Sequence, residues 1–448
     1  MALLLIKKMA VGSGEVRIEL SSGAVLLGQL NKAYRDPENC RLRGRTLDLK
    51  SAYRQLATCV EQERLSVIGV HDVHRKCPAF FVQRTMPFGA SSSVLAFNRC
   101  SKALWLIGVV QLDLLWSCYF DDFPQTETVG LASSAKNAAE LFLSIVGWDY
   151  AVEAKKNKAF DVEFQMLGVL VDFGDPEAVI IKNLPSRVEE ICTSLEALAL
   201  EGSMKPAVAS MLTGRLQFTE SQVMGRLGSF ALAQVRERAH MVGGTVLMPE
   251  SLTDALTWLC GRLRSVGPRR VSGVGSSLPV LVFTDGACEG VDREVATYGA
   301  VLYDPCSEPP KFEYFGARVE PSLMLEWTGG EVRQVIGQAE LLPIFVARKH
   351  WARTLGGRRV IFFVDNNAAL DGMIRGYSDS KASVSILKAY AEVDDACPCI
   401  PWFARVQSAA NVADGPSRLK FEELEGISGS LRTNPAVVRT LMLTGLLP

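Results

Sequence analysis

Carboxylates at the ends of apolar runs are the residues of this sequence whose types and spacing could do chemistry. Asp121 and Asp122 follow the apolar run LLWSCYF, and Asp48 ends the shorter run RTL. If the two runs pair as strands, the three acids meet at one edge of a sheet. Aligned carboxylates of this kind hold hard cations such as Mg²⁺, and two such metals can join or cut phosphodiesters.

A second set of acids occupies the far half of the chain. Asp285 follows VLVFT, Asp365 follows VIFFV, Glu340 lies near the start of a helical pattern, and Asp414 lies in NVADGPSR. Four acids on separate strands and helices suit metal-dependent hydrolysis, in which activated water replaces a covalent nucleophile. Taken alone, Asp365 and the two asparagines after it could equally be a strand-to-helix cap.

The net charge limits how nucleic acid could be bound. The 448 residues carry a formal charge of −1 and are 48% hydrophobic, which predicts two to four domains with buried cores and excludes a global basic field. Phosphate contacts would then be local. The candidate residues, each more often part of a solvated surface, are Arg41, Arg43, Arg45, Lys155, Lys156, Lys158, Arg358 and Arg359, with Arg215, Arg226, Arg236 and Arg238 in a helical region.

Cysteine usage and hydropathy predict an intracellular protein of the cytoplasm or nucleus. The 11 cysteines form no CxxC pair and no disulfide-framework spacing, which indicates reduced thiols. The apolar stretch 103–116 contains Gln111 and Asp113 and is too short to span a bilayer. We expect it to be a buried helix that leads into a strand, and we expect no membrane partner.

The elements expected in the first half place the acid pair at a turn. A strand at 114–120 precedes the pair, and Pro124 closes the turn. A helix at 132–146 and a strand at 164–173 follow.

The second half begins with helices and changes character after a linker. Residues 185–262 have a helical pattern that opens with Ser186 and Glu189 as a capping box. The stretch 265–279 is rich in Gly, Ser and Pro and is the best linker in the chain. Beyond it we expect strands at 280–284, 300–303, 312–319, 360–364 and 402–406, and a helix at 338–354.

Several motifs resemble reverse transcriptases fused to ribonuclease H. LDLKSAYRQL resembles reverse-transcriptase motif A, MPFGASSSVLAFNR motif B and YFDD motif C, while KKNKAF and MLGVLVDF resemble motifs D and E. VLVFTDGACEG, GQAELLPIFVARKHW, VIFFVDNNAAL and NVADGPSR resemble successive parts of ribonuclease H. The Pro-Phe-Gly and the NVADGPSR most resemble retrotransposon polymerases of the Ty3-like and DIRS-like kind.

The resemblance implies an α/β (α+β) fold. It would comprise a reverse-transcriptase palm with a helical thumb or connection, followed by a ribonuclease H-like mixed-sheet domain. The implied domains are partial fingers or an N-terminal segment (1–47), palm (48–180), thumb or connection (181–264), linker (265–279), ribonuclease H-like domain (280–425) and tail (426–448).

The resemblance also implies an activity and its residues. The chain would be an RNA-directed DNA polymerase with ribonuclease H activity, acting on RNA template, DNA primer, RNA–DNA hybrid and dNTPs. Two Mg²⁺ or Mn²⁺ ions per active site would be held by Asp48, Asp121 and Asp122 in the first site and by Asp285, Glu340, Asp365 and Asp414 in the second. Substrate would be bound by Tyr53 as the gate beneath the sugar, by Phe88 and Gly89 as the pocket floor, and by Lys158 as the motif D proton donor.

Two departures from the family keep other functions open. Only 47 residues precede Asp48, where the family has longer fingers, which suggests a fragment or a decayed copy. Residues 403–410 lack the histidine that many ribonucleases H carry before the last acid. The alternatives are an inactive remnant that at most binds nucleic acid, and a protein with only ribonuclease H activity. Tyr53 could be a core residue, and Lys158 could be a surface lysine.

Overall fold

The computed structural model describes residues 41–153, 156–223, 225–241, 247–272, 278–289, 295–329, 335–436 and 438–439. Described residues up to Ile181 form one compact unit, the N-terminal unit. Lys182–Val271 and the described residues from 278 onward form a second, the C-terminal unit. Residues 1–40 of the predicted N-terminal segment, 273–277 of the predicted linker and 440–448 of the predicted tail lie outside the described residues.

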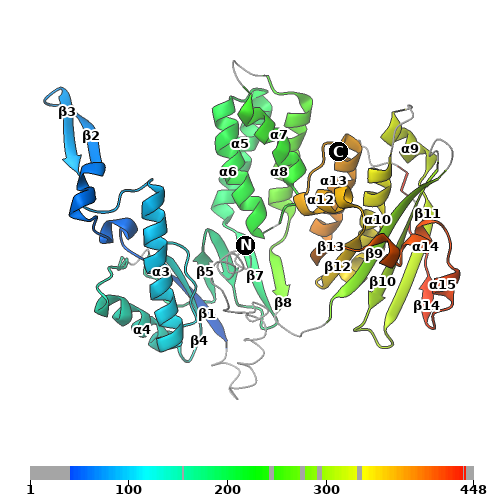
Figure 1. Ribbon diagram of the computed structural model, residues 1–448, viewed down its shortest axis with the longest axis horizontal. Coiled ribbons are helices and arrows are strands. Elements are labelled where there is room, and N and C mark those ends of the chain that lie inside the picture. The colour runs from blue at the N-terminus through cyan, green and yellow to red at the C-terminus, as the bar shows by residue number, and fades with distance from the viewer. Residues whose placement is uncertain are drawn as a thin grey trace. The chain divides into compact units, whose positions relative to one another are not determined.

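The N-terminal unit is built on two antiparallel strands, β1 (Leu42–Asp48) and β4 (Asp122–Thr128). Helices α3 (Ser91–Leu112) and α4 (Ala132–Ile145) share a hydrophobic core with these strands (Figure 1). The remaining elements are η1 (Ala52–Gln55), η2 (Val60–Leu65), the antiparallel hairpin β2 (Val67–Asp72) and β3 (Cys77–Val82), and the strands β5 (Glu163–Met166) and β6 (Val169–Asp172). Strand β7 (Ala178–Asn183) begins in this unit, and its last two residues belong to the C-terminal unit.

Helix α3 corrects the helix expected at 103–116, because it begins earlier and ends at Leu112. By length and composition it is the one helix in the described parts of the chain that could cross a membrane. One row of its residues, including Phe97, Leu104 and Gly108, packs into the core of the N-terminal unit. Gly108 is required there, since a side chain at this position would overlap the ring of Trp116.

Two predicted strands of the N-terminal unit differ in the structure. Residues 114–120 form only isolated bridges, Trp116 with Gln125 and Tyr119 with Asp122, and Pro124 lies inside β4 instead of closing the turn. The strand expected at 164–173 is the hairpin β5–β6, because the chain reverses at Leu167 and Gly168. Both residues have positive φ (48° and 78°), as the type I′ turn of a two-residue hairpin requires.

The C-terminal unit opens with four helices, α5 (Pro185–Glu201), α6 (Pro206–Val223), α7 (Ser229–His240) and α8 (Glu250–Ser265), which confirms the helical pattern. The predicted capping box is wrong. The N-cap of α5 is Leu184 and Pro185 is the first helical residue, which needs no capped N–H. Part of the predicted linker is a strand, β8 (Arg269–Ser272).

A six-stranded mixed sheet in the order β13-β12-β9-β10-β11-β14 dominates the rest of the unit. β9 (Val280–Glu289), β10 (Val295–Asp304) and β11 (Lys311–Arg318) are antiparallel neighbours. β12 (Arg359–Val364) and β13 (Ile400–Arg405) continue parallel to β9, and β14 (Ser430–Arg432) is parallel to β11. The predicted strands are all present, but β9 and β10 are longer than expected.

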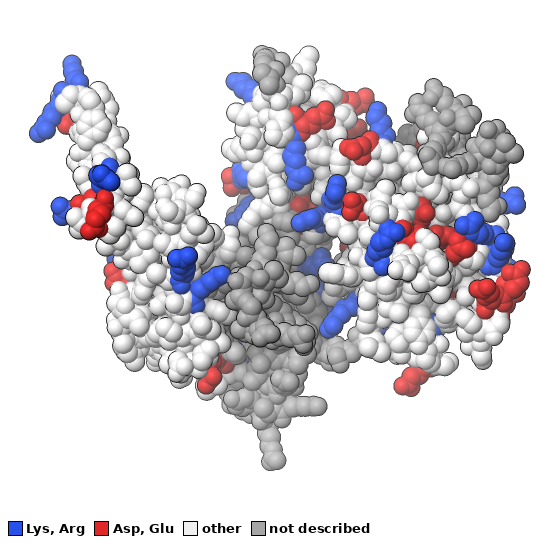
Figure 2. Space-filling view, viewed as in Figure 1, with Lys and Arg blue, Asp and Glu red and all other residues white. Residues whose placement is uncertain are grey.

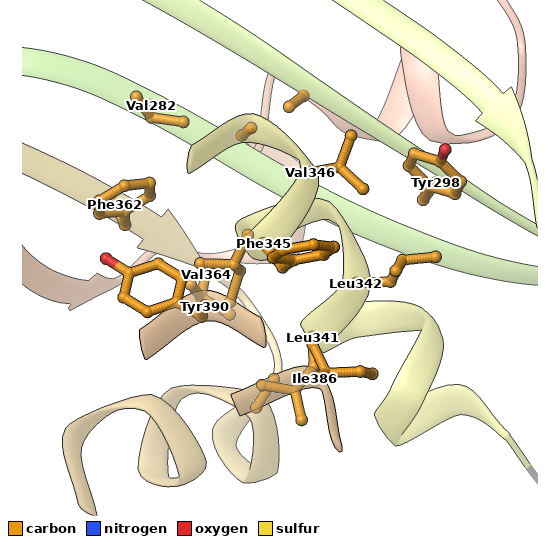
Figure 3. Packing of buried hydrophobic residues seen from close by; sticks show 14 of the residues in the cluster. Val282, Tyr298, Leu341, Leu342, Phe345, Val346, Phe362, Val364, Ile386 and Tyr390 are labelled. Atoms are coloured by element: carbon orange, nitrogen blue, oxygen red, sulfur yellow. The ribbon is translucent and has the colours of Figure 1, made fainter. Parts of the chain in front are cut away.

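Helices cover both faces of this sheet. On one face, α10 (Ile336–His350) and α13 (Lys381–Ala396) contribute Leu342, Phe345 and Tyr390 to a core with Val282 and Phe362 of the strands (Figure 3). On the other face, α14 (Asp414–Ser417) packs against β10 and β11, and α15 (Glu422–Glu425) contributes Leu424 to a smaller apolar cluster. The remaining elements are α9 (Pro321–Thr328), α11 (Ala352–Leu355), α12 (Asn367–Arg375) and η3 (Ser408–Ala410).

Two helices of the C-terminal unit depart from expectation. The helix predicted at 338–354 is interrupted at Trp351, which separates α10 from α11. The helix that begins at Asp414 is a single turn. The predicted fold class, α/β with helices on mixed sheets, is confirmed.

Candidate active sites

The pairing of β1 with β4 brings the first three acids into one neighbourhood. Asp48 and Asp122 are directly paired across the two strands. Tyr119 and Asp122 exchange backbone hydrogen bonds of 2.9 and 3.0 Å, which closes a tight turn with Phe120 and Asp121 at its tip. The turn predicted for the acid pair is therefore present, and its strand partner is the one that carries Asp48.

The pKa values in this first cluster are raised because the acids are buried and lie close together. Burial raises the pKa of Asp122 to about 6, and the charges of Asp121 and Asp48 add to the effect. Burial also raises the pKa of Asp121, with a further contribution from Asp48. Lys156 opposes both shifts. Its Nζ donates to Asp48 Oδ2 at 2.5 Å, which raises the pKa of the lysine.

The basic residue that contacts this cluster is therefore Lys156, two residues before the predicted Lys158, and both lysine side chains are exposed. The segment after Lys156 is anchored by Arg45, whose Nη1 lies 3.3 Å from Asn157 Oδ1 and 2.9 Å from Glu140 Oε1. Arg45 is fully buried, so its prediction as a phosphate contact is wrong. The lysine-rich run 155–158 signalled a basic residue here, but only the fold selects Lys156; Lys155 lies outside the described residues.

Of the residues predicted to bind substrate, Tyr53 interacts with the first cluster, and Phe88 packs against Tyr53. Tyr53, in η1, packs its ring 5.0 Å from that of Phe88 and 4.7 Å from that of Phe97, measured between centroids. Burial raises the pKa of Tyr53, and the charge of Asp121 raises it further. Gly89 has a φ of 91°, which turns the chain directly after Phe88. Tyr53 and the acid at the turn thus share one environment.

The second cluster is the tighter of the two. Ligand atoms of Asp285, Glu340 and Asp365 all lie within 4.8 Å of one another, and no other group of acids in the described parts of the chain meets this condition. Asp365 follows β12 directly, whereas Asp285 lies inside β9 and not at its end as predicted. β9 continues past the end of β12, so both side chains reach the same edge.

Glu340 comes from α10 on the neighbouring layer and lies in its second turn, one turn later than predicted. A close approach makes this possible. A side chain on Gly286 would overlap the backbone of Ala339 and Glu340, so glycine lets the helix rest on the strand. Gly286 N then donates to Glu340 Oε2 at 3.3 Å. The motif VLVFTDGACEG contains this glycine, but its role depends on how the helix packs on the strand.

Burial and crowding also raise the pKa values of the second cluster. Burial raises the pKa of Glu340 to about 8, with contributions from Asp285 and Asp365. Burial raises the pKa of Asp285 to about 6, partly offset by a hydrogen bond from Ser417. Asn366 also bonds Glu340 and caps α12, accepting from Ala368 N and Ala369 N. Asn366 is therefore the helix cap that the alternative interpretation predicted, while Asp365 lies with the other two acids.

Asp414 lies near this cluster without belonging to its innermost group. Its charge raises the pKa of Asp285, but its Oδ1 is paired with Arg418 at 3.0 Å. Sequence reasoning missed two neighbours, Ser417 and Asn411, because serine and asparagine are common surface residues. The only signal was their position around Asp414 in the motif NVADGPSR.

The donor atoms of the second cluster fit a hard divalent cation. All three groups are carboxylates, the ligands that Mg²⁺ and Mn²⁺ prefer. Asp365 Oδ1 is buried and has no hydrogen-bond partner among the described residues, an unmet need that a cation would satisfy. The first cluster has the same donor chemistry, but one oxygen of Asp48 is engaged by Lys156.

Several other predicted phosphate contacts are engaged in structural ion pairs. Arg358 binds both oxygens of Asp304, and Arg215 lies 2.8 Å from Glu190. Arg238 is buried and donates to the carbonyl of Met204. On the face drawn in Figure 2, basic and acidic side chains are interspersed over the described surface.

No protein-family model and no curated protein matches this sequence. Solved structures similar to it include the foamy viral protease-reverse transcriptase, as a dRH form with double-stranded DNA, in a further complex with double-stranded DNA, and in complex with an RNA/DNA hybrid. Each has 13% identity and a TM-score of 0.41 over 82%, 82% and 84% of this chain. The chain spans 57%, 68% and 45% of those chains, and so loose a likeness carries no weight for its function.

Proposed function

We propose that the C-terminal unit hydrolyses the RNA strand of an RNA–DNA hybrid with two Mg²⁺ or Mn²⁺ ions. The observation that carries the proposal is the convergence of Asp285, Glu340 and Asp365 within 4.8 Å. Carboxylates forced together in a buried place repel one another, as the raised pKa values of Asp285 and Glu340 record. Such an arrangement is costly for stability alone and is typical of a site that binds cations.

Each residue has a role in this proposal. Asp285, Glu340 and Asp365 would hold the metals, with Asp414 contributing once it leaves Arg418. Bound metals would supply an activated water and neutralise charge on the phosphate. Gly286 N and Asn366 hold the Glu340 carboxyl toward the other acids.

A second activity is favoured by the register of β1 and β4. Asp48 pairs with Asp122, and Asp121 lies at the adjoining turn with Tyr53 nearby. We propose that these acids hold two metals for adding dNTPs to a DNA primer on an RNA template. Lys156, already hydrogen-bonded at the cluster, takes the place proposed for Lys158 as the cation beside the leaving pyrophosphate.

With both activities, the chain would be an RNA-directed DNA polymerase fused to ribonuclease H, from an intracellular retroelement of the Ty3-like or DIRS-like kind. Hybrid cleavage with only the second site competent, or no activity at all, are the outcomes that would replace this proposal. They correspond to a protein with ribonuclease H activity alone and to an inactive remnant.

The test of the first activity is cleavage of an RNA–DNA hybrid with labelled RNA, in Mg²⁺ or Mn²⁺ and without nucleotides. We expect cleavage by the wild type and a loss of at least about a hundredfold in Asp365→Asn. Asp371→Asn, the same change on an exposed acid of α12, is the matched control and should cleave like the wild type. Metal-independent cleavage, or equal cleavage by both variants, contradicts the proposal.

A further inference from the structure

Three paired positions make a shallow channel across the C-terminal sheet. Asp285 of β9 is paired with Gly299 of β10, which in turn is paired with Gly316 of β11. Directly paired residues project their side chains to the same face of a sheet. Two of the three positions have no side chain, so the surface beside the Asp285 carboxylate is left open down to the backbone.

Helix α14 fills this channel. A side chain on Gly299 would overlap the backbone nitrogen of Ser417, and one on Gly316 would overlap the carbonyl oxygen of Pro416. Both residues of the helix are buried. The backbone of the single turn therefore lies directly on the strands.

The close approach delivers a hydroxyl to the acid cluster. Ser417 is fully buried, and its Oγ donates to Asp285 Oδ2 and lies 2.9 Å from the carbonyl oxygen of Asp414. The hydroxyl has one proton, so it can donate to only one of the two acceptors at a time. A single side chain thus touches the central acid of the cluster and the residue that begins α14.

A second contact pins the segment before the helix. Asn411 Nδ2 donates to the carbonyl of Thr284, the residue before Asp285, at 3.1 Å, and Asn411 Oδ1 accepts from Ala413 N at 3.2 Å. Asn411 is itself buried. The turn that carries Asp414 is therefore tied to β9 at two consecutive residues, Thr284 and Asp285.

We propose that Ser417 is a positioning residue of the metal site, which rests on the proposed hydrolytic function. By holding one carboxylate oxygen, it restricts rotation of the Asp285 carboxylate and presents it to the metals together with Glu340 and Asp365. Through α14 it also keeps Asp414 beside the cluster. Loss of a residue that orients a metal ligand typically lowers metal affinity or activity about ten- to a hundredfold.

The test is a titration of the full chain with Mn²⁺, in which electron paramagnetic resonance measures the concentration of the free ion. Sites that Asp365→Asn removes are assigned to the cluster. For those sites we expect Ser417→Ala to weaken Mn²⁺ binding by about tenfold or more. Ser385→Ala is the matched control, because its hydroxyl also donates to a backbone carbonyl, that of Lys381, but on α13. It should bind Mn²⁺ like the wild type.

A second variant separates positioning from packing. Ser417→Cys keeps nearly the same volume but offers only a weak donor. We expect it to lose Mn²⁺ affinity as Ser417→Ala does, to keep the wild-type thermal midpoint, and to lower kcat for hybrid cleavage with little change in KM. If Ser417→Ala fails to fold, the cysteine variant alone decides.

The possible outcomes test the role of Ser417 separately from the proposed hydrolytic function. Wild-type Mn²⁺ affinity in folded Ser417→Ala and Ser417→Cys overturns the role of Ser417 and leaves the metal site standing. A wild-type chain with no Mn²⁺ site that depends on Asp365 overturns both.

Discussion

The protonation of Glu340 decides how the second cluster takes up a metal. Burial, together with Asp285 and Asp365, raises the pKa of Glu340 to about 8, so the metal-free site holds a proton on this residue at neutral pH. A metal ligand must be deprotonated, so binding releases that proton and metal affinity rises with pH. The same proton links the site to the stability of the fold.

Replacing Glu340 should change how stability depends on pH. The unfolded residue titrates near 4.5 and the folded one near 8, so the folded state holds the extra proton between these values. Without metal, the free energy of unfolding should therefore fall as pH rises from 4.5 to 8. Glu340→Gln cannot lose a proton, so it should flatten this fall and be the more stable protein at pH 8.

Denaturant unfolding in EDTA at several pH values measures the effect. Glu423→Gln, on the exposed side of α15, is the control and should keep the wild-type slope. An equal slope in wild type and Glu340→Gln would show that Glu340 titrates as an ordinary exposed acid.

Tyr53 makes a separate prediction about sugar selection at the first cluster. If its ring lies beside the nucleotide sugar, a 2′-hydroxyl would overlap it, at a cost of about 1–3 kcal/mol, or about ten- to a hundredfold in rate. Tyr53→Ala should then admit ribonucleotides. The measurement is the ratio of kcat/KM for dNTP and rNTP.

Tyr53→Phe is the matched control for this experiment. It keeps the ring that packs against Phe88 and Phe97 and should keep the wild-type ratio. If Tyr53→Ala is folded and active but has an unchanged ratio, Tyr53 is a core residue.

At the scale of elements, Arg262 joins three helices of the C-terminal unit. From α8 it donates to both oxygens of Glu220 on α6, the shorter bond being 2.8 Å, and its Nε lies 2.7 Å from Asp395 on α13. Arg262 and Glu220 each have side chains only 2% exposed. Burial raises the pKa of Glu220 to about 7 even with its partner present. Arg262 thus joins the helical region to a helix that packs on the mixed sheet. Breaking its ion pairs would leave a buried charge without a partner, which is strongly destabilising.

Arg262→Met should therefore destabilise the C-terminal unit by about 3–5 kcal/mol, because it leaves Glu220 buried without compensation. The loss should be larger at pH 8 than at pH 6, where Glu220 can take up a proton. Arg264→Met on the same helix breaks an exposed pair with Glu196 and should leave the free energy of unfolding close to that of the wild type. Equal losses in urea unfolding would contradict the structural role of Arg262.

Most helices and strands could be predicted from the sequence. Apolar runs and helical periodicity predicted five of the six strands of the mixed sheet, all but β14, and the helices of 185–262, because these patterns report which side chains face a core. Element ends were less predictable. β9 extends through Asp285 because β10 pairs with it as far as Glu289, and a cross-strand partner is not visible in a local pattern.

For the candidate sites, the sequence predicted the acidic residues better than the residues that contact them. Acid types and motif order identified Asp285, Glu340 and Asp365, which the structure brings together. Ser417 and Lys156 could not be assigned, since each acquires its role from a contact across more than a hundred residues of chain. Long-range packing of this kind leaves no local trace in composition or spacing.

At the scale of the whole molecule, the two acid clusters belong to different compact units. Asp121 lies in the N-terminal unit and Asp365 in the C-terminal unit, with separate supporting residues. Several arginines in the described parts of the chain are spent on internal ion pairs, consistent with a net charge of −1. The clusters should therefore act as independent chemical sites.

Independence predicts a crossed pattern of losses. Asp121→Asn should lower primer extension at least about a hundredfold and leave hybrid cleavage intact, while Asp365→Asn should do the reverse. Both reactions are measured on the same preparations, with circular dichroism as the control for folding. Parallel loss of both activities in a folded variant would mean that the sites are coupled.

The most direct measurement is anomalous diffraction from crystals soaked in Mn²⁺. The structure predicts Mn²⁺ bound by carboxylate oxygens of Asp285, Glu340 and Asp365, at distances of roughly 2.0–2.6 Å, and no such peak in Asp365→Asn crystals. Mn²⁺ bound elsewhere with none at these three residues, or a peak that survives Asp365→Asn, would contradict the account of this cluster as a metal-dependent nuclease site.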